Sequence, residues 1–60
     1  MLDGTVVQLD SADPAVRRAA IIALGQSKDP AALRPLAAVY RTDPDPALRE
    51  LALQAGRYIR

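Results

Sequence analysis

The chain has 60 residues, a net charge of +1 and neither cysteine nor histidine, and this composition excludes several classes of protein. Without thiols or imidazoles it can form no disulfide and no zinc finger, and it lacks the usual nucleophile–base pairs. A charge so close to zero argues against a broad nucleic-acid or membrane surface. A chain this short forms one domain at most and buries only about 60% of its unfolded surface, so we expect stabilisation by oligomerisation.

The first predicted element is a short helix over residues 3–10. Leu2, Val6 and Leu9 have helical spacing, although a run of β-branched residues weakens the helix. No apolar run reaches the roughly 18 residues that a membrane-spanning helix needs, and the start lacks the basic stretch of a signal peptide. We therefore expect a cytoplasmic protein without membrane contacts.

A second helix is predicted over residues 14–26. Asp13 can cap its free N–H groups, and Pro14 suits the first helical position. Apolar residues recur at helical spacing, at Val16, Ala19, Ala20, Ala23 and Leu24. Gly25 is expected to mark the end of this helix.

The third and fourth helices are predicted over residues 31–42 and 46–59. Pro35 would disturb the third helix, so we expect a 3₁₀ turn over residues 31–34 and a regular helix from Pro35. The intervening TDPDP segment favours a tight connection. The buried side of the fourth helix is predicted at Leu48, Leu51, Ala52, Ala55, Tyr58 and Ile59.

An internal repeat relates the second and fourth helices. Asp13 and Asp45 begin the same pattern 32 residues apart, with matches at Pro14/Pro46, Ala15/Ala47, Arg17/Arg49, Ala20/Ala52 and Ala23/Ala55. A period of this length with a helical hairpin in each unit predicts an α-solenoid. The two copies differ at two places: Ile22 aligns with Gln54, and Leu24-Gly25 aligns with Gly56-Arg57.

A family resemblance is carried by the stretch DPAVRRAAIIALGQSKDPAALRPLAAVYRTDPDPALRELA. It resembles the short HEAT-like repeats of phycobilisome lyases, with their Asp-x-x-Val-Arg-x-x-Ala pattern, Ala-Leu-Gly, an Asp-containing loop and a Leu-rich helix. The resemblance covers about residues 11–60. It implies an all-α, four-helix α-α superhelix of about two repeats, either part of a longer solenoid or a small self-associating protein. It also implies that Asp13 and Asp45 lie in turns, and that Arg17 and Arg49 pair with neighbouring turn acids.

No residues are predicted to act in catalysis or to bind a cofactor or metal. The hydroxyl side chains have no activating base, and too few oxygen ligands accompany Asp43 and Asp45 for a cation site. These two aspartates are better interpreted as turn and cap residues. We therefore expect no enzymatic activity from the chain itself.

The leading functional hypothesis is a protein–protein interaction scaffold that self-associates through its terminal helices. Stacked repeats need neighbours, so we expect an open apolar interface at Leu48, Leu51, Ala55 and Ile59, with Ile22 as a further contact. The first helix of one copy would pack beside residues 45–60 of another, as a swap or a two-fold dimer.

Two alternatives use other features. Arg34 and Arg41 share one helix face and could form a basic groove for an acidic protein segment or nucleic acid; binding of nucleic acid would also use Arg57 and Arg60. Phosphate binding usually takes about 6–10 contacts, so nucleic acid is the less favoured partner. An accessory role in a bilin lyase-like enzyme rests on the family resemblance alone.

Overall fold

The computed structural model describes residues 2–59, and the side chains of residues 4–59. It contains the helices α1 (Leu2–Gln8), α2 (Pro14–Ser27), α3 (Leu33–Thr42) and α4 (Pro46–Ile59), with a 3₁₀ turn, η1 (Pro30–Ala32), before α3. No strand occurs in the described part of the chain, which confirms the predicted all-α fold. No helix between residues 2 and 59 has the length and apolar character needed to cross a bilayer.

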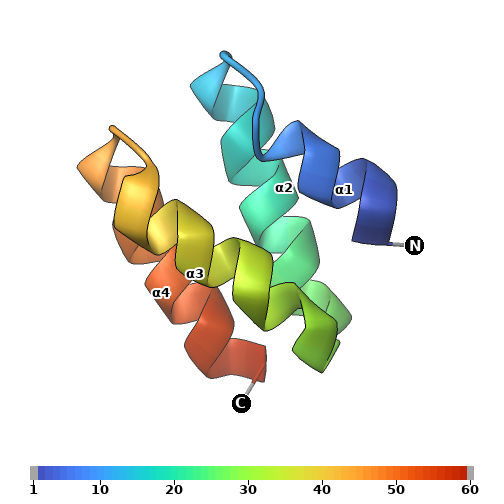
Figure 1. Cartoon of the computed structure of the whole chain (residues 1–60). Helices are drawn as coiled ribbons and strands as arrows, with labels where there is room; N and C mark the ends of the chain where they lie inside the picture. The colour runs from blue at the N-terminus through green and yellow to red at the C-terminus, as the bar shows by residue number, and fades with distance from the viewer. Residues whose placement is uncertain (1, 60) are drawn as a thin grey trace.

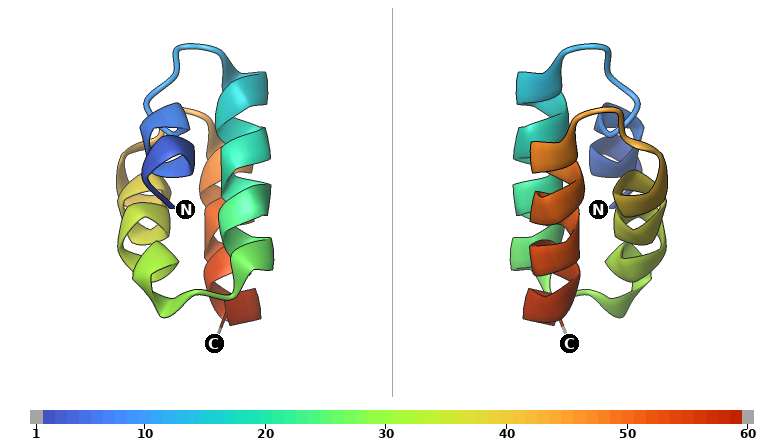
Figure 2. Two further views of the ribbon diagram at one scale, coloured as in Figure 1. Left: turned by 90° about the vertical axis from the view of Figure 1, so that its right-hand side faces the viewer. Right: turned by 90° about the vertical axis from the view of Figure 1, so that its left-hand side faces the viewer.

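The four helices form two layers (Figures 1 and 2). Helices α2 and α4 lie side by side in one layer, and α1 and α3 lie in the other. We call α1 with α2 the first unit, and α3 with α4 the second unit. The 32-residue repeat relates one unit to the other, so each residue of the second unit has an equivalent in the first.

Three Asp-Pro pairs begin the elements of this stack. The side chains of Asp13, Asp29 and Asp45 each accept a hydrogen bond of 2.9 Å from the backbone N–H two residues later. An N-cap side chain satisfies one of the free N–H groups of the first turn, and the proline that follows has no N–H to satisfy. The same local signal therefore starts α2, η1 and α4.

Proline 35 lies inside the first turn of α3 rather than at its start. The α-helix begins at Leu33, and the 3₁₀ turn covers Pro30–Ala32, slightly earlier than expected. Pro35 is the third residue of α3, where a backbone N–H would have no intrahelical partner. The proline is accommodated there without loss of a helical hydrogen bond.

Glycine 25 does not end α2, contrary to the expectation from sequence. The helix continues to Ser27 and ends at Lys28, which adopts a left-handed backbone conformation with φ of 53°. A Cβ atom at Gly25 would lie 3.0 Å from the Cβ of Ala55 on α4. The glycine therefore allows α2 and α4 to approach closely.

The core lies between the two layers and joins both units. Ile21, Leu24 and Leu36 are its largest fully buried side chains. Its other members are Leu9, Ala20, Ala32, Val39, Leu48, Ala52 and Ala55. Burial of these residues corrects the expected open stripe on α4, because Leu48, Ala52 and Ala55 face the chain's own core. Periodicity showed which residues share a face of α4, and α2 and α3 cover that face.

Candidate interaction surfaces

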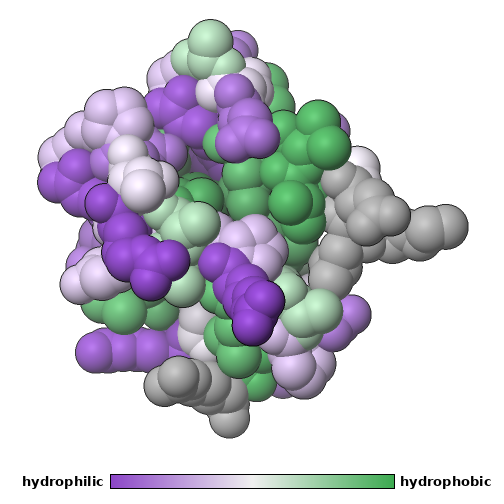
Figure 3. All heavy atoms as spheres, in the orientation of Figure 1, coloured by the Kyte–Doolittle hydropathy of each residue, from purple (hydrophilic) through white to green (hydrophobic). Residues whose placement is uncertain are grey.

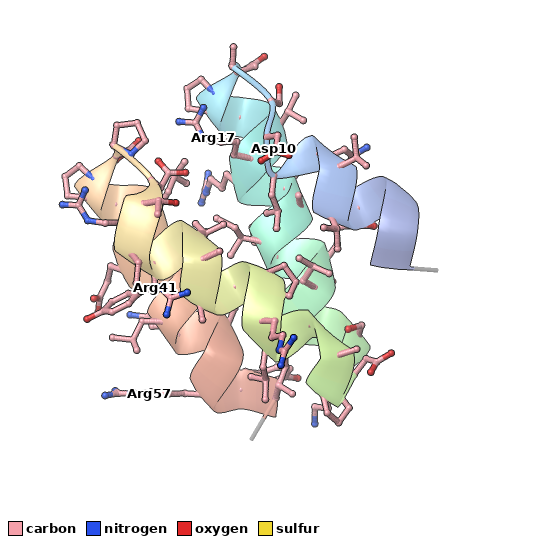
Figure 4. The ribbon with its side chains drawn as sticks, in the orientation of Figure 1. Asp10, Arg17, Arg41 and Arg57 are labelled. Atoms are coloured by element: carbon pink, nitrogen blue, oxygen red, sulfur yellow. The ribbon has the colours of Figure 1, made fainter. Side chains whose placement is uncertain are left out.

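Arg17 connects the first unit to the second. Its Nε donates to Oδ2 of Asp43 at 3.0 Å, and its NH1 donates to the carbonyl of Ser11 at 2.8 Å. The Asp43 side chain is only 4% exposed, so the ion pair is largely shielded from water. Figure 4 shows Arg17 reaching from α2 toward the loop that joins α3 to α4.

The second unit repeats this arrangement except for the acid. Arg49 donates to the carbonyl of Asp43 at 2.8 Å, as Arg17 does to Ser11. Among residues 4–59, however, no carboxylate lies within ion-pair distance of Arg49. The two arginines thus occupy equivalent positions, and of the two, within residues 4–59, Arg17 joins one unit to the other.

Exposed apolar residues mark the outer side of the first unit. Val7 is 70% exposed, whereas its equivalent Val39 is 7% exposed. Ala19 and Ala23 are also exposed, whereas their equivalents on α4 are at least partly buried, at Leu51 and Ala55. We call Val7, Ala19, Ile22 and Ala23 the α1–α2 end face; the left view of Figure 2 faces this end of the stack.

A groove lies between α3 and α4 at the other end of the stack. Its volume is about 480 Å³, and apolar residues form much of its lining, at Leu33, Ala37, Tyr40, Leu53 and Gly56. Leu53 and Gly56 are only half-buried, whereas their equivalents Ile21 and Leu24 are buried in the core. We call this hollow the α3–α4 groove; the right view of Figure 2 faces the two helices that form it.

Arginine side chains surround the α3–α4 groove. Arg34 and Arg57 belong to its lining, and Arg41 lies exposed two turns beyond Arg34 on α3. Arg41 reaches from α3 toward α4, and Arg57 projects into solvent (Figure 4). Arg60, the fourth arginine of the expected basic surface, lies outside the described residues.

A second hollow, of about 500 Å³, separates α1 from α3. Val6, Leu9 and Val39 form much of its apolar lining, and Arg17 and Asp43 also line it. Figure 3 shows an apolar area between α1 and α3 at this place, with hydrophilic side chains over α3 and α4.

The aspartates of the TDPDP loop serve the fold. Asp43 accepts hydrogen bonds from Arg17, and its Oδ1 also accepts one from the backbone N–H of Asp45 at 2.9 Å. Asp45 caps α4. Among the residues that the structure describes, no three metal-ligating side chains are grouped together.

A family model for HEAT repeats matches residues 5–56. The chain belongs to the HEAT-repeat family. No curated protein and no solved structure gives a significant match to it. The family match covers HEAT repeats in general, so the resemblance to the lyase-type repeats stays a prediction.

The family resemblance implied that Arg17 and Arg49 pair with neighbouring turn acids; Arg17 does so with Asp43, whereas Arg49 has no carboxylate partner among residues 4–59. Asp43 was predicted to be a turn residue, but the sequence did not indicate that it, 26 residues from Arg17, is the acid that Arg17 contacts. The repeat contained a usable signal, since Asp43 stands where the first unit has Ser11. The exposure of Val7 could have been found in the same way, by comparison with Val39.

Proposed function

We propose that this chain is a non-catalytic protein-interaction module that associates with a second copy of itself through a terminal unit of its stack. HEAT repeats typically serve as scaffolds for protein interactions, and each repeat packs only on its neighbours. The single module over residues 1–60 would therefore gain stability by covering an end of its stack.

The contrast between Val7 and Val39 carries the proposal. Val39 is buried where the second unit packs on the first, and Val7 occupies the equivalent place on the outer side of the first unit. Ala19, Ile22 and Ala23 extend this apolar surface along α2. An apolar face of this kind on so small a protein is typical of a contact site.

A two-fold arrangement suits the α1–α2 end face. In such a dimer the same surface of both copies meets, which requires only that the surface complement itself. Ala19 and Ala23 leave room for two α2 helices to approach, with Ile22 and Val7 packing at the sides. The contact is small, so we expect a dimer that forms on the order of 10–100 μM.

Sedimentation equilibrium over a range of protein concentrations tests the proposal. Ala23→Glu should shift the protein to monomer, because it places a charge in the centre of the α1–α2 end face. Ile22→Glu should weaken the dimer in the same direction. Gln54→Glu is the matched control, since Gln54 is the equivalent of Ile22 on α4 and lies outside the proposed interface. A parent protein that is monomeric throughout this range would contradict self-association.

A further inference from the structure

We propose that the α3–α4 groove binds an acidic amphipathic helix of a partner protein. The inference rests on the proposed role of the chain as an interaction module, and it concerns the end of the stack opposite to the α1–α2 end face. The groove presents apolar side chains from two neighbouring helices. An amphipathic helix places its apolar face into a groove of this kind.

The internal repeat shows that a helix fits this position. The equivalent surface of the first unit is covered by the second unit, and Ile21 and Leu24 lie fully buried there. In the second unit Leu53 is half-buried, and Gly56 replaces the leucine. A Cβ atom at Gly56 would meet only Leu33 Cδ2, at 3.8 Å. The glycine therefore leaves a shallow place on α4 that an incoming side chain can fill.

A second copy stacked in the manner of the internal repeat does not suit the groove. In the chain itself, α4 approaches α2 at Gly25, where even a Cβ atom would lie 3.0 Å from Ala55. The residue equivalent to Gly25 in the second unit is Arg57. The same spacing between two copies would force Arg57 against Ala23 of the second copy, and overpacking of this kind is destabilising.

The positive charge of the arginines in and beside the groove indicates that it binds an acidic partner rather than a second copy of the chain. Arg34 and Arg57 lie in its lining, and no acidic residue belongs to that lining among residues 4–59. Arg34 and Arg41 are two turns apart on α3, about 10 Å along the helix axis. Acidic side chains at the same separation on a partner helix would meet both arginines. Arginine forms bidentate hydrogen bonds with carboxylates, and complementary charge sets the register of the partner.

Nucleic acid is less well matched to the same surface. Three described arginines fall short of the about 6–10 phosphate contacts that useful binding requires. Leucine and alanine side chains occupy the space between them, so a phosphate backbone would cover apolar surface. An acidic helix with leucines on one face satisfies both parts of the surface.

Fluorescence anisotropy with a labelled synthetic peptide tests the inference. The probe is a helical peptide with leucines at positions i, i+3, i+4 and i+7, which form one apolar face. Pairs of glutamates seven residues apart flank this face on both sides. We expect saturable binding in the micromolar range. Double Arg34→Glu and Arg41→Glu substitution should weaken binding at least about tenfold, because each carboxylate then meets a like charge. Arg18→Glu is the control, with an exposed arginine on α2, and should change affinity less than about twofold.

Three outcomes would overturn the inference: no binding of the probe, equal binding of a peptide with the same composition but scrambled order, or tighter binding of duplex DNA at the same salt concentration. Ala37→Glu, which closes the groove without removing an arginine, should also abolish binding; unchanged affinity would count against the groove. Sedimentation equilibrium on the same samples keeps the two proposals separate. If the protein dimerises but does not bind the probe, only the proposed peptide binding in the groove is contradicted. If it binds the probe but stays monomeric, only the proposed self-association is contradicted.

Discussion

At the scale of single residues, Asp43 accepts hydrogen bonds from three residues, of which Arg17 belongs to the first unit. Its carboxylate accepts from Arg17 and from the N–H of Asp45, and its carbonyl accepts from Arg49. We expect Asp43→Ala to lower the free energy of unfolding by about 2–3 kcal/mol, because it leaves a partly buried guanidinium without its counter-charge. Urea unfolding of the variant and the parent at one protein concentration measures the difference.

Ser11→Ala is the matched control at the equivalent position of the first unit. It removes one hydrogen bond, from the N–H of Asp13 to the hydroxyl, so we expect a loss below about 1 kcal/mol. Equal losses at Ser11 and Asp43 would contradict a particular role for the ion pair. The Arg17→Ala and Asp43→Ala double variant should lose less than the sum of the two single variants, because neither charge is then left alone.

The sequence could predict the local role of these residues, and the family resemblance implied that Arg17 pairs with a turn acid, but neither identified which acid. Asp-Pro-Ala is a capping signal that acts within one turn, so the roles of Asp13 and Asp45 could be inferred from their immediate neighbours. The Arg17–Asp43 pair depends on how one unit lies on the next. That arrangement is a property of the packed helices, and the neighbours of Asp43 in the sequence do not show it; only the comparison of Asp43 with Ser11 in the repeat marks it.

At the scale of helices, the spacing between α2 and α4 depends on Gly25. Ala is normally the better helix former by about 1 kcal/mol, yet Gly25→Ala would place a Cβ atom 3.0 Å from that of Ala55. We expect this substitution to destabilise the fold by about 1–2 kcal/mol through overpacking. Thermal unfolding followed by circular dichroism, at equal protein concentrations, measures the effect.

Gly56→Ala provides the control within the same repeat. Gly56 is also inside a helix, but an added Cβ atom there would make only an ordinary contact with Leu33. This substitution should stabilise the fold by about 0.5–1 kcal/mol. Adding Ala55→Gly to the Gly25→Ala variant removes the opposing Cβ atom and should restore part of the lost stability. Stabilisation at both glycines would show that α2 and α4 can separate without cost.

Helix bounds followed the sequence closely because their signals are local. Asp-Pro pairs start the elements, and apolar spacing extends them. The role of Gly25 was misassigned because a glycine near a helix end can serve either as a terminator or as a point of close approach. Likewise, periodicity grouped Leu48, Ala52 and Ala55 on one face of α4. It could not show that α2 and α3 already cover that face.

At the scale of the whole molecule, the two ends of the stack do not match each other. Stacking a second copy by the internal repeat would bring its Ser11 to Arg49, where the chain itself pairs Asp43 with Arg17. It would also bring its Ala23 to Arg57, where the chain has Ala55 against Gly25. Both differences weaken a head-to-tail contact. Such a contact would otherwise repeat without closing and build an open filament.

Changing both positions should therefore make the ends complementary. In the Ser11→Asp and Arg57→Gly double variant, Arg49 gains a carboxylate partner and α2 of the next copy can approach α4 closely. We expect species larger than a dimer at tens of micromolar, since contacts of the same kind already hold the two units of one chain together. Sedimentation velocity should show the weight-average sedimentation coefficient rising with concentration in the double variant and levelling off in the parent.

The two single variants, Ser11→Asp and Arg57→Gly, are the controls. Each corrects only one of the two contacts and should give a smaller rise in the sedimentation coefficient. A double variant that sediments like the parent would show that the internal repeat does not describe how copies could stack.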